Sequence, residues 1–294
     1  MDILIGLIPA LLWGITPLWV HFMGGKPIQQ LLGTTYGALI VGILIWLVKK
    51  PNVTFEDFFW CFIGGACWSL GQLTQYNAFR KLGVSTTTPI VTGLQLVGVN
   101  IIGVLFFGSW ESSVAKGIGF SAVILVVIGV VLTTRTGNGE TGGNSISKRE
   151  FTKSLIELIV GSGIGYTACS TFPKITGADG WTTFPPQSLG MFAGAIIFSL
   201  LIKDYRDQKP LFKKETFRNV LTGFNSGIGT AGYLISITLN GVSTGFTLSQ
   251  MCVVVSTFGG LVILHEHKTG KSLLYTVSGV AMVLIGGIMT SFIR

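Results

Sequence analysis

Long apolar runs separated by short polar connections dominate this chain. Ten such runs can be distinguished, and each approaches the roughly 20 residues that an α-helix needs to cross about 30 Å of hydrocarbon. They cover residues 3–22, 28–48, 57–79, 84–107, 114–134, 152–172, 184–203, 216–239, 244–264 and 272–293. This pattern predicts an all-α polytopic membrane protein with ten transmembrane helices.

The composition supports a location in the lipid bilayer. The 294 residues are 49% hydrophobic and 11% charged, whereas soluble domains carry about 25% charged residues. Of the 20 Lys and Arg residues, 15 lie in the odd-numbered connections between the runs and 5 in the even-numbered connections and at the C-terminus. Because basic loops tend to stay in the cytoplasm, we expect a multi-pass protein of the cytoplasmic membrane with both termini outside. The net charge of +8 then reflects topology, and no nucleic-acid partner is expected.

The two halves of the chain share short motifs that lie 155 to 158 positions apart. The matched motifs are GVST at 83–86 and 241–244, QxxGxxxG at 30–37 and 187–194, IG at 128–129 and 285–286, and the single residues Gln95 and Gln250. Internal duplication of an apolar chain is typical of transporters, in which the substrate site lies between the repeats.

A segment rich in Gly, Asn, Ser and Thr, from 134 to 150, separates the halves and has the composition of a flexible linker. We therefore expect a first five-helix repeat over residues 1–134, a cytoplasmic linker over 135–150 and a second five-helix repeat over 151–294. Each half has an odd number of crossings, so the second repeat is expected to be inverted relative to the first.

Uncharged polar side chains and tryptophans inside the apolar runs mark the candidate substrate site, because polar groups are costly to place in lipid. Trp68, Gln72 and Gln75 are spaced i, i+4 and i+7 and so share one helix face. The full candidate set is Trp13, Trp68, Gln72, Gln75, Thr88, Thr92, Gln95, Asn225, Ser249 and Gln250. The alternative for each residue is hydrogen bonding between helices, at about 1 kcal/mol.

The chemistry of this set suits a neutral, polyhydroxylated ligand. An amide offers two donors and an acceptor to adjacent hydroxyls, and an indole gives a flat apolar wall for a sugar ring. Residues 85–89, STTTP, add a second indication, since Pro89 either interrupts its helix beside the site or occupies an ordinary first turn.

Two acids are candidates for proton coupling. Glu157 lies inside the run 152–172, and its alternative role is an i, i+4 pair with Lys153. Glu266 lies between His265 and His267 at the end of a run, and its alternative role is a solvated helix cap.

Residues for catalysis or cofactor binding are not indicated. The chain contains no P-loop, no HExxH motif and no paired CxxC spacing. The four cysteines fall inside apolar runs and are expected to be core residues. We expect a protein that is not an enzyme and that binds neither a metal nor a cofactor.

Several motifs recur in a characteristic order along the chain. They are Trp13-Gly14, GTTYGALI at 33–40, WSLGQ at 68–72, GVSTTTP at 83–89, TGLQLVG at 92–98, LSQ at 248–250 and STFGG at 256–260. In these motifs the chain resembles the glucose/ribose porter family of the drug/metabolite transporter superfamily, found in low-GC Gram-positive bacteria. The resemblance implies a ten-helix fold and uptake of a monosaccharide, glucose or ribose, with protons.

The resemblance has two departures. The family commonly has Gly-Glu-Trp where this chain has GSW at 108–110, with Glu111 one position later, and Gly-Glu-Arg-Lys where it has HEHK at 265–268. Two further functional classes stay open at this point: an exporter or exchanger of another small metabolite on the same fold, and a membrane scaffold or sensor that transports nothing. Uniport, without coupled protons, also stays open, as does the oligomeric state.

Overall fold

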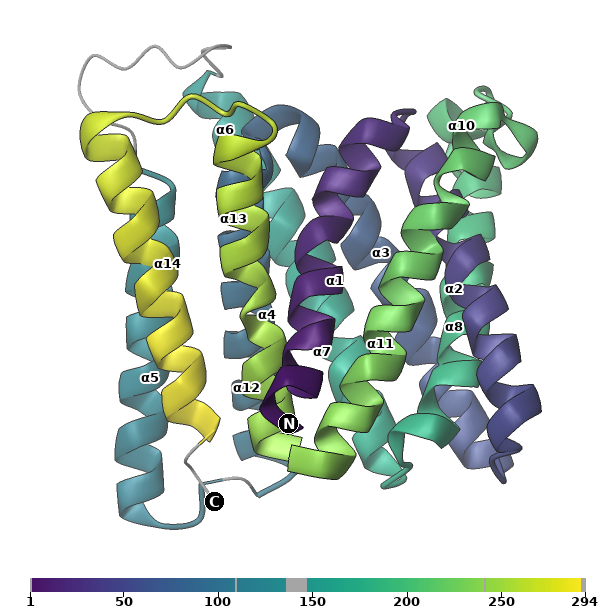
Figure 1. The fold of residues 1–294 in the computed structure, drawn as a ribbon, viewed down its shortest axis with the longest axis horizontal. Helices are drawn as coiled ribbons and strands as arrows, with labels where there is room; N and C mark the ends of the chain where they lie inside the picture. The colour runs from purple at the N-terminus through teal and green to yellow at the C-terminus, as the bar shows by residue number, and fades with distance from the viewer. Residues whose placement is uncertain (1, 109, 136–146, 241, 292–294) are drawn as a thin grey trace.

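The computed structural model describes residues 2–108, 110–135, 147–240 and 242–291 (Figure 1). Every regular element in these ranges is a helix, as the sequence predicts. In chain order they are α1 Asp2–Met23, α2 Pro27–Lys49, α3 Phe55–Leu82, α4 Val84–Phe106, α5 Ser113–Thr133, α6 Lys148–Glu157, the π-helix η1 Leu158–Gly163, α7 Ile164–Thr171, the 3₁₀ turn η2 Phe172–Ile175, α8 Gly180–Leu201, α9 Lys203–Arg206, the 3₁₀ turn η3 Pro210–Phe212, α10 Lys214–Arg218, α11 Val220–Asn240, α12 Val242–Gln250, α13 Cys252–Val262 and α14 Gly270–Ser291.

Local sequence explains where several helices begin. The Thr54 hydroxyl accepts a hydrogen bond from the Asp57 amide, and Asp57 Oδ2 accepts one in return from the Thr54 amide, which makes a capping box for α3. Asp179 caps α8 in a similar way, through the Thr182 amide. α6 begins with a capping box at Ser147 and so starts inside the range that we assigned to the linker; residues 136–146 of that range lie outside the described residues.

Seven segments of the described chain are long and apolar enough to cross a membrane. They lie in α1, α2, α4, α5, the stretch from α6 to η2, α8 and α14. Two other predicted spans form α3, with 28 residues including Gln72 and Gln75, and α11, with 21 residues including Asn225.

The expectation of one continuous helix over 244–264 was wrong. The helix is broken at Met251 into α12 and α13, because the Met251 amide bonds to the Leu248 carbonyl, three residues back, and tightens the backbone into a turn. Pro89, in contrast, lies inside α4 without interrupting it. It stands in the second turn, near the end at which helix amides lack partners in any case.

Helices that are distant in the sequence pack together in a recurring arrangement. α3 packs on α8 and α2 on α11; α1 packs on α11 and α3 on α7; α4 packs on α13, and α5 on α14. Figure 1 shows α5 and α14 side by side at one edge of the bundle.

Glycines make the closest of these approaches possible. A Cβ on Gly33 or Gly37 of α2 would collide with the backbone of α10 and α11, and a Cβ on Gly190 of α8 would collide with the Phe62 carbonyl of α3. Packing through small residues is expected where helices associate in lipid.

The most completely buried stretches of α2 and α4 lie toward the same face of the bundle. We call it the linker-side face: α3 ends and α4 begins there, α13 connects to α14, and α5 and α6 flank residues 136–146 (Figure 1). Every residue from 84 to 93 in α4 is buried, whereas from 94 to 106 only Leu96 and Gly103 are. Residues 27–35 of α2 are likewise all buried. In α2 and α4, burial is therefore more complete near the linker-side face than toward the far face, where α1 begins and α14 ends (Figure 1).

Candidate functional site

The polar face predicted for α3 is joined to α7 by one tyrosine. The Tyr166 hydroxyl lies 2.9 Å from Gln72 Oε1 and also contacts Gln75 Oε1. The Trp68 indole packs at a tilt against the Tyr166 ring, with centroids 6.2 Å apart. Gln72 and Tyr166 are buried, while Trp68 and Gln75 are half-buried. The predicted trio therefore forms one cluster with Tyr166, at the contact between α3 and α7.

The side chains of this cluster cannot satisfy all of one another's hydrogen-bond donors and acceptors. A tyrosine hydroxyl carries one proton, so it can donate to only one of the two amide oxygens at a time. Gln72 Nε2 lies 3.5 Å from Gln75 Oε1, at the limit of a hydrogen bond. Turning one amide would let its NH₂ group donate to the tyrosine oxygen, since the O and N positions of an amide are assigned from the network. Either arrangement leaves amide donors available to a further acceptor.

Gln95 extends the polar lining onto α4. Its Nε2 donates to Ser170 Oγ at 3.0 Å, which joins α4 to α7. Ser170 and Tyr166 lie one helical turn apart on α7, so the α3 cluster and Gln95 face the same helix. Sequence reasoning missed Tyr166 and Ser170, although both are polar side chains inside an apolar run, the signal that selected the other candidates.

Trp13 and Asn225 are placed between α1 and α11. Trp13 Nε1 donates to the Ser226 carbonyl at 3.1 Å, and Asn225 Nδ2 donates to the Leu12 carbonyl at 2.6 Å and to Thr16 Oγ1 at 3.0 Å. These bonds join two helices, which is the alternative role that we gave for such residues. The structure thus divides the predicted set into an α3–α4–α7 cluster and an α1–α11 cluster.

The remaining candidates are buried hydroxyls and one amide. Thr88 and Thr92 lie in the sealed part of α4, and Thr88 Oγ1 has no hydrogen-bond partner among the described residues. Ser249 donates to the Phe246 carbonyl at 2.7 Å, and Gln250 Nε2 lies 3.5 Å from Ser249 Oγ. Gln250 ends α12 directly before the break at Met251, so it stands at an interruption of its helix.

The two acids lie toward the linker-side face and differ in role. Glu157 is paired with Lys81 at 3.1 Å and with Lys153 at 4.0 Å; the pair with Lys153 agrees with the sequence pattern, while the pair with Lys81 links α6 to α3. Glu266 is a cap for another helix: its two carboxylate oxygens accept the backbone amides of Val84 and Ser85 at the start of α4. It lies beyond the end of α13, in the connection to α14.

Lys268 is the cation that faces this cap from the same connection. Its Nζ donates to Thr276 Oγ1 on α14 at 3.0 Å. Burial lowers the pKa of Lys268 to about 8, an effect that the nearby Glu266 carboxylate partly opposes.

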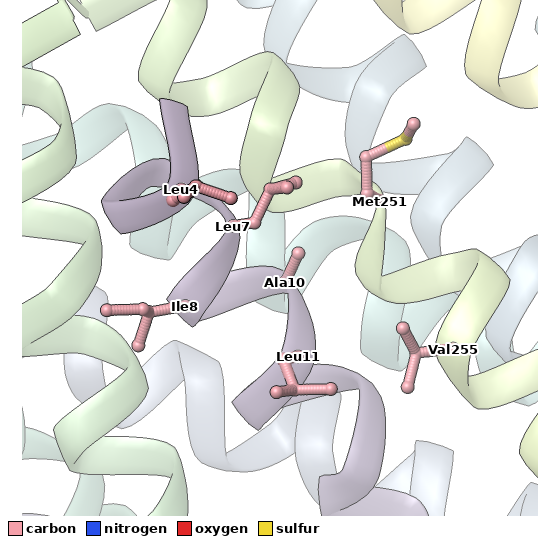
Figure 2. A pocket seen from close by; sticks show the side chains of 7 residues that line it. All are labelled: Leu4, Leu7, Ile8, Ala10, Leu11, Met251 and Val255. Carbon is pink, nitrogen blue, oxygen red and sulfur yellow. The ribbon is translucent and has the colours of Figure 1, made fainter. Parts of the chain in front are cut away.

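Two pockets open in apolar surroundings. One, of about 320 Å³, lies between α1 and the α12–α13 break and is lined by Leu4, Leu7, Ile8, Ala10, Leu11, Met251 and Val255 (Figure 2). The other, of about 340 Å³, is lined by Trp46, Leu47, Lys50 and Pro51 at the end of α2. Neither lining includes a residue of the predicted site.

Comparisons with known proteins identify the family of this chain. The family described as "Sugar transport protein" matches residues 4–293. The chain is 41% identical to the "Putative ribose uptake protein RbsU" of Latilactobacillus sakei, over 100% of this chain and 99% of that protein. It is 36% identical to the "Probable glucose uptake protein GlcU" of Bacillus cereus, over 98% of each chain. A crystal structure shares the fold, with a TM-score of 0.60 at 15% identity over 99% of this chain and 97% of that one. The chain belongs to the sugar transport protein family.

Proposed function

We propose that this protein imports a monosaccharide, glucose or ribose, across the bacterial cytoplasmic membrane by alternating access. The observation that carries this proposal is the α3–α4–α7 cluster. In it the Gln72 and Gln75 amides meet the Tyr166 hydroxyl beside Trp68, and Gln95 reaches the same helix, α7, through Ser170. Amides can bridge neighbouring sugar hydroxyls, and an aromatic face suits the C–H surface of a pyranose or furanose. Within the described residues these contacts involve uncharged side chains, which fits a neutral substrate.

We further propose ten crossings arranged as two inverted repeats. The ten are α1, α2, α3, α4, α5, the stretch α6–α7, α8, α11, the pair α12–α13, and α14. Exchanging the halves turns the α3–α8 contact into α11–α2, the α1–α11 contact into α7–α3, and the α1–α13 contact into α7–α4, and each of these contacts is present. The α5–α14 contact maps onto itself. Such reciprocity is what a pseudo-two-fold axis in the membrane plane would produce.

The repeat also suggests how the two clusters belong to one site. Ser170, the partner of Gln95, stands 157 positions after Trp13 and so matches it at the spacing of the repeat. Gln250, the repeat mate of Gln95, is accordingly proposed to face the Trp13 region from α12. The sugar would then bind at the seam, with Trp13, Asn225, Ser249 and Gln250 contributed by one side and the α3–α4–α7 cluster by the other.

Counterflow in proteoliposomes tests this function. Vesicles loaded with unlabelled glucose or ribose should take up the same labelled sugar transiently, while vesicles without protein should not. Gln95→Ala leaves sugar hydroxyls unpaired and should weaken apparent affinity by about 1–3 kcal/mol. Failure of the folded protein to exchange any monosaccharide would overturn the proposal and favour the exporter of another metabolite, which shares the fold but not the substrate.

A further inference from the structure

The start of α4 is held closed by a carboxylate from a distant part of the chain. Glu266, in the α13–α14 connection, accepts the Val84 amide with Oε1 and the Ser85 amide with Oε2, at 2.8 Å for Ser85. These amides are among those that a helix leaves without internal partners, and an anion there also interacts favourably with the helix dipole. Hydrogen bonds to an ionised group are roughly twice as strong as neutral ones. Glu266 thereby fastens α4 to the end of α13.

Two glycines make room for this contact. Gly83 has φ of +80°, a backbone conformation that suits glycine, and a Cβ there would lie 2.9 Å from the Glu266 carboxylate. A Cβ on Gly260 of α13 would lie 3.0 Å from the Ser85 amide nitrogen and 3.1 Å from Glu266 Oε2. The carboxylate therefore sits in a space that any larger residue at either position would narrow.

The segment that Glu266 holds is buried, but several of its hydroxyl groups lack hydrogen-bond partners. Ser85, Thr87, Thr88 and, on α13, Thr257 have buried hydroxyl oxygens that lack a hydrogen-bond partner within the described ranges of the chain. Burying a hydroxyl without a partner is unfavourable, and water reaching the segment would remove that cost. The closed arrangement thus depends on contacts that outweigh the unpaired hydroxyls, and the Glu266 cap is one such polar contact at this end of α4.

We propose that Glu266 is the latch of a gate at the linker-side face. The gate consists of residues 84–93 of α4 packed against α13. In the structure it is shut by the Glu266 cap, while the outer half of α4 is less covered. Release of the carboxylate from the Val84 and Ser85 amides lets α4 and α13 separate and hydrates the unpaired hydroxyls. The inference rests on the proposed alternating access, in which this face must open to release the sugar.

Cysteine accessibility tests the latch without requiring sugar. The reporter is Ser85→Cys, close in size to the native residue, in a chain whose four native cysteines are replaced. An impermeant maleimide is applied to permeabilised membranes, so that the reagent reaches both faces. With Glu266 present, the reporter should label slowly; Glu266→Ala should raise the rate about tenfold or more, as expected when an open state changes from minor to major. Glu266→Gln retains one acceptor oxygen and should give an intermediate rate.

Two matched controls separate the latch from general loosening. Glu150→Ala removes another acid near this face, one that caps its own helix, α6, through Ser147, and should leave the reporter protected. Ser69→Cys places a second reporter in a buried position where α3 meets α8, and it should stay protected in Glu266→Ala. Equal labelling of both reporters would show that Glu266 only maintains the fold and would overturn the proposal.

Unchanged labelling of Ser85→Cys in both Glu266 variants would also overturn it. The sugar function fails separately: loss of counterflow in the wild type, with the labelling pattern intact, would reject the substrate and keep the gate. Active counterflow with unchanged labelling would reject the gate alone.

Discussion

At the scale of single residues, Tyr166 determines how the amides of α3 are presented. Its hydroxyl is shared between Gln72 and Gln75, and its ring supports Trp68. The helical spacing of Trp68, Gln72 and Gln75 was enough to predict their common face. It could not predict Tyr166, because that contact depends on how α7 packs on α3, which no local pattern specifies.

Removing this hydroxyl gives the first prediction. Tyr166→Phe keeps the ring and removes the hydroxyl that Gln72 and Gln75 share, so the amides lose their positioning contact and sugar affinity should fall by about 1–3 kcal/mol. The measurement is the concentration dependence of counterflow. Tyr36→Phe is the matched control, because the Tyr36 hydroxyl bonds to the Leu211 carbonyl instead, and it should leave affinity unchanged. Equal sugar affinities for Tyr166→Phe and wild type would show that the cluster serves helix packing and does not bind the sugar.

Glu157 carries the second prediction, on coupling. Glu157→Gln keeps the shape and removes the charge that pairs with Lys81 and Lys153. If protons are coupled through this residue, the variant should lose sugar accumulation driven by an imposed proton gradient and retain exchange. Uptake is measured with and without the gradient. Accumulation equal to wild type would assign Glu157 to a purely structural ion pair, and a wild type that never accumulates sugar would identify a uniporter.

At the scale of elements, the hydrophobic runs predicted more than proline did. The GxxxG pairs at Gly33/Gly37 and Gly190/Gly194 do lie at close helix contacts. Pro89 did not break α4, and the actual break, at Met251, has neither Gly nor Pro beside it. A short 3₁₀ turn in an apolar helix is set by tertiary packing, so sequence alone gave no sign of it.

Glycine substitutions test the close contacts. Gly190→Ala places a methyl group against the Phe62 carbonyl, so it should lower the melting temperature of the purified protein and cost about 1–3 kcal/mol. Gly117→Ala on α5 is the control: a Cβ there meets nothing within 4 Å, and the helix propensity of alanine should stabilise it slightly. A Gly190→Ala protein as stable as Gly117→Ala would mean that α8 lies further from α3 than described.

At the scale of the whole molecule, charge and packing define opposite faces independently. The odd-numbered connections, which carry 15 of the 20 basic residues, lead to the linker-side face, near which residues 27–35 of α2 and 84–93 of α4 are buried. The charge distribution predicts which face is cytoplasmic, and this stays a prediction. The pairing of α2 with α11 and of α3 with α8 could not be predicted from composition, since contacts between distant helices leave no local pattern.

The final prediction is orientation in the membrane. Asp207, in the connection after α9, and Asn52, before α3, are both exposed and belong to connections of opposite parity. In a chain without native cysteines, Asn52→Cys should react with an impermeant maleimide added to intact cells, and Asp207→Cys should react only in inside-out vesicles. The physical reason is that the basic connections are retained on the cytoplasmic side during insertion. Labelling of Asp207→Cys in intact cells, with Asn52→Cys protected, would invert the protein and place the Glu266 latch at the outer face.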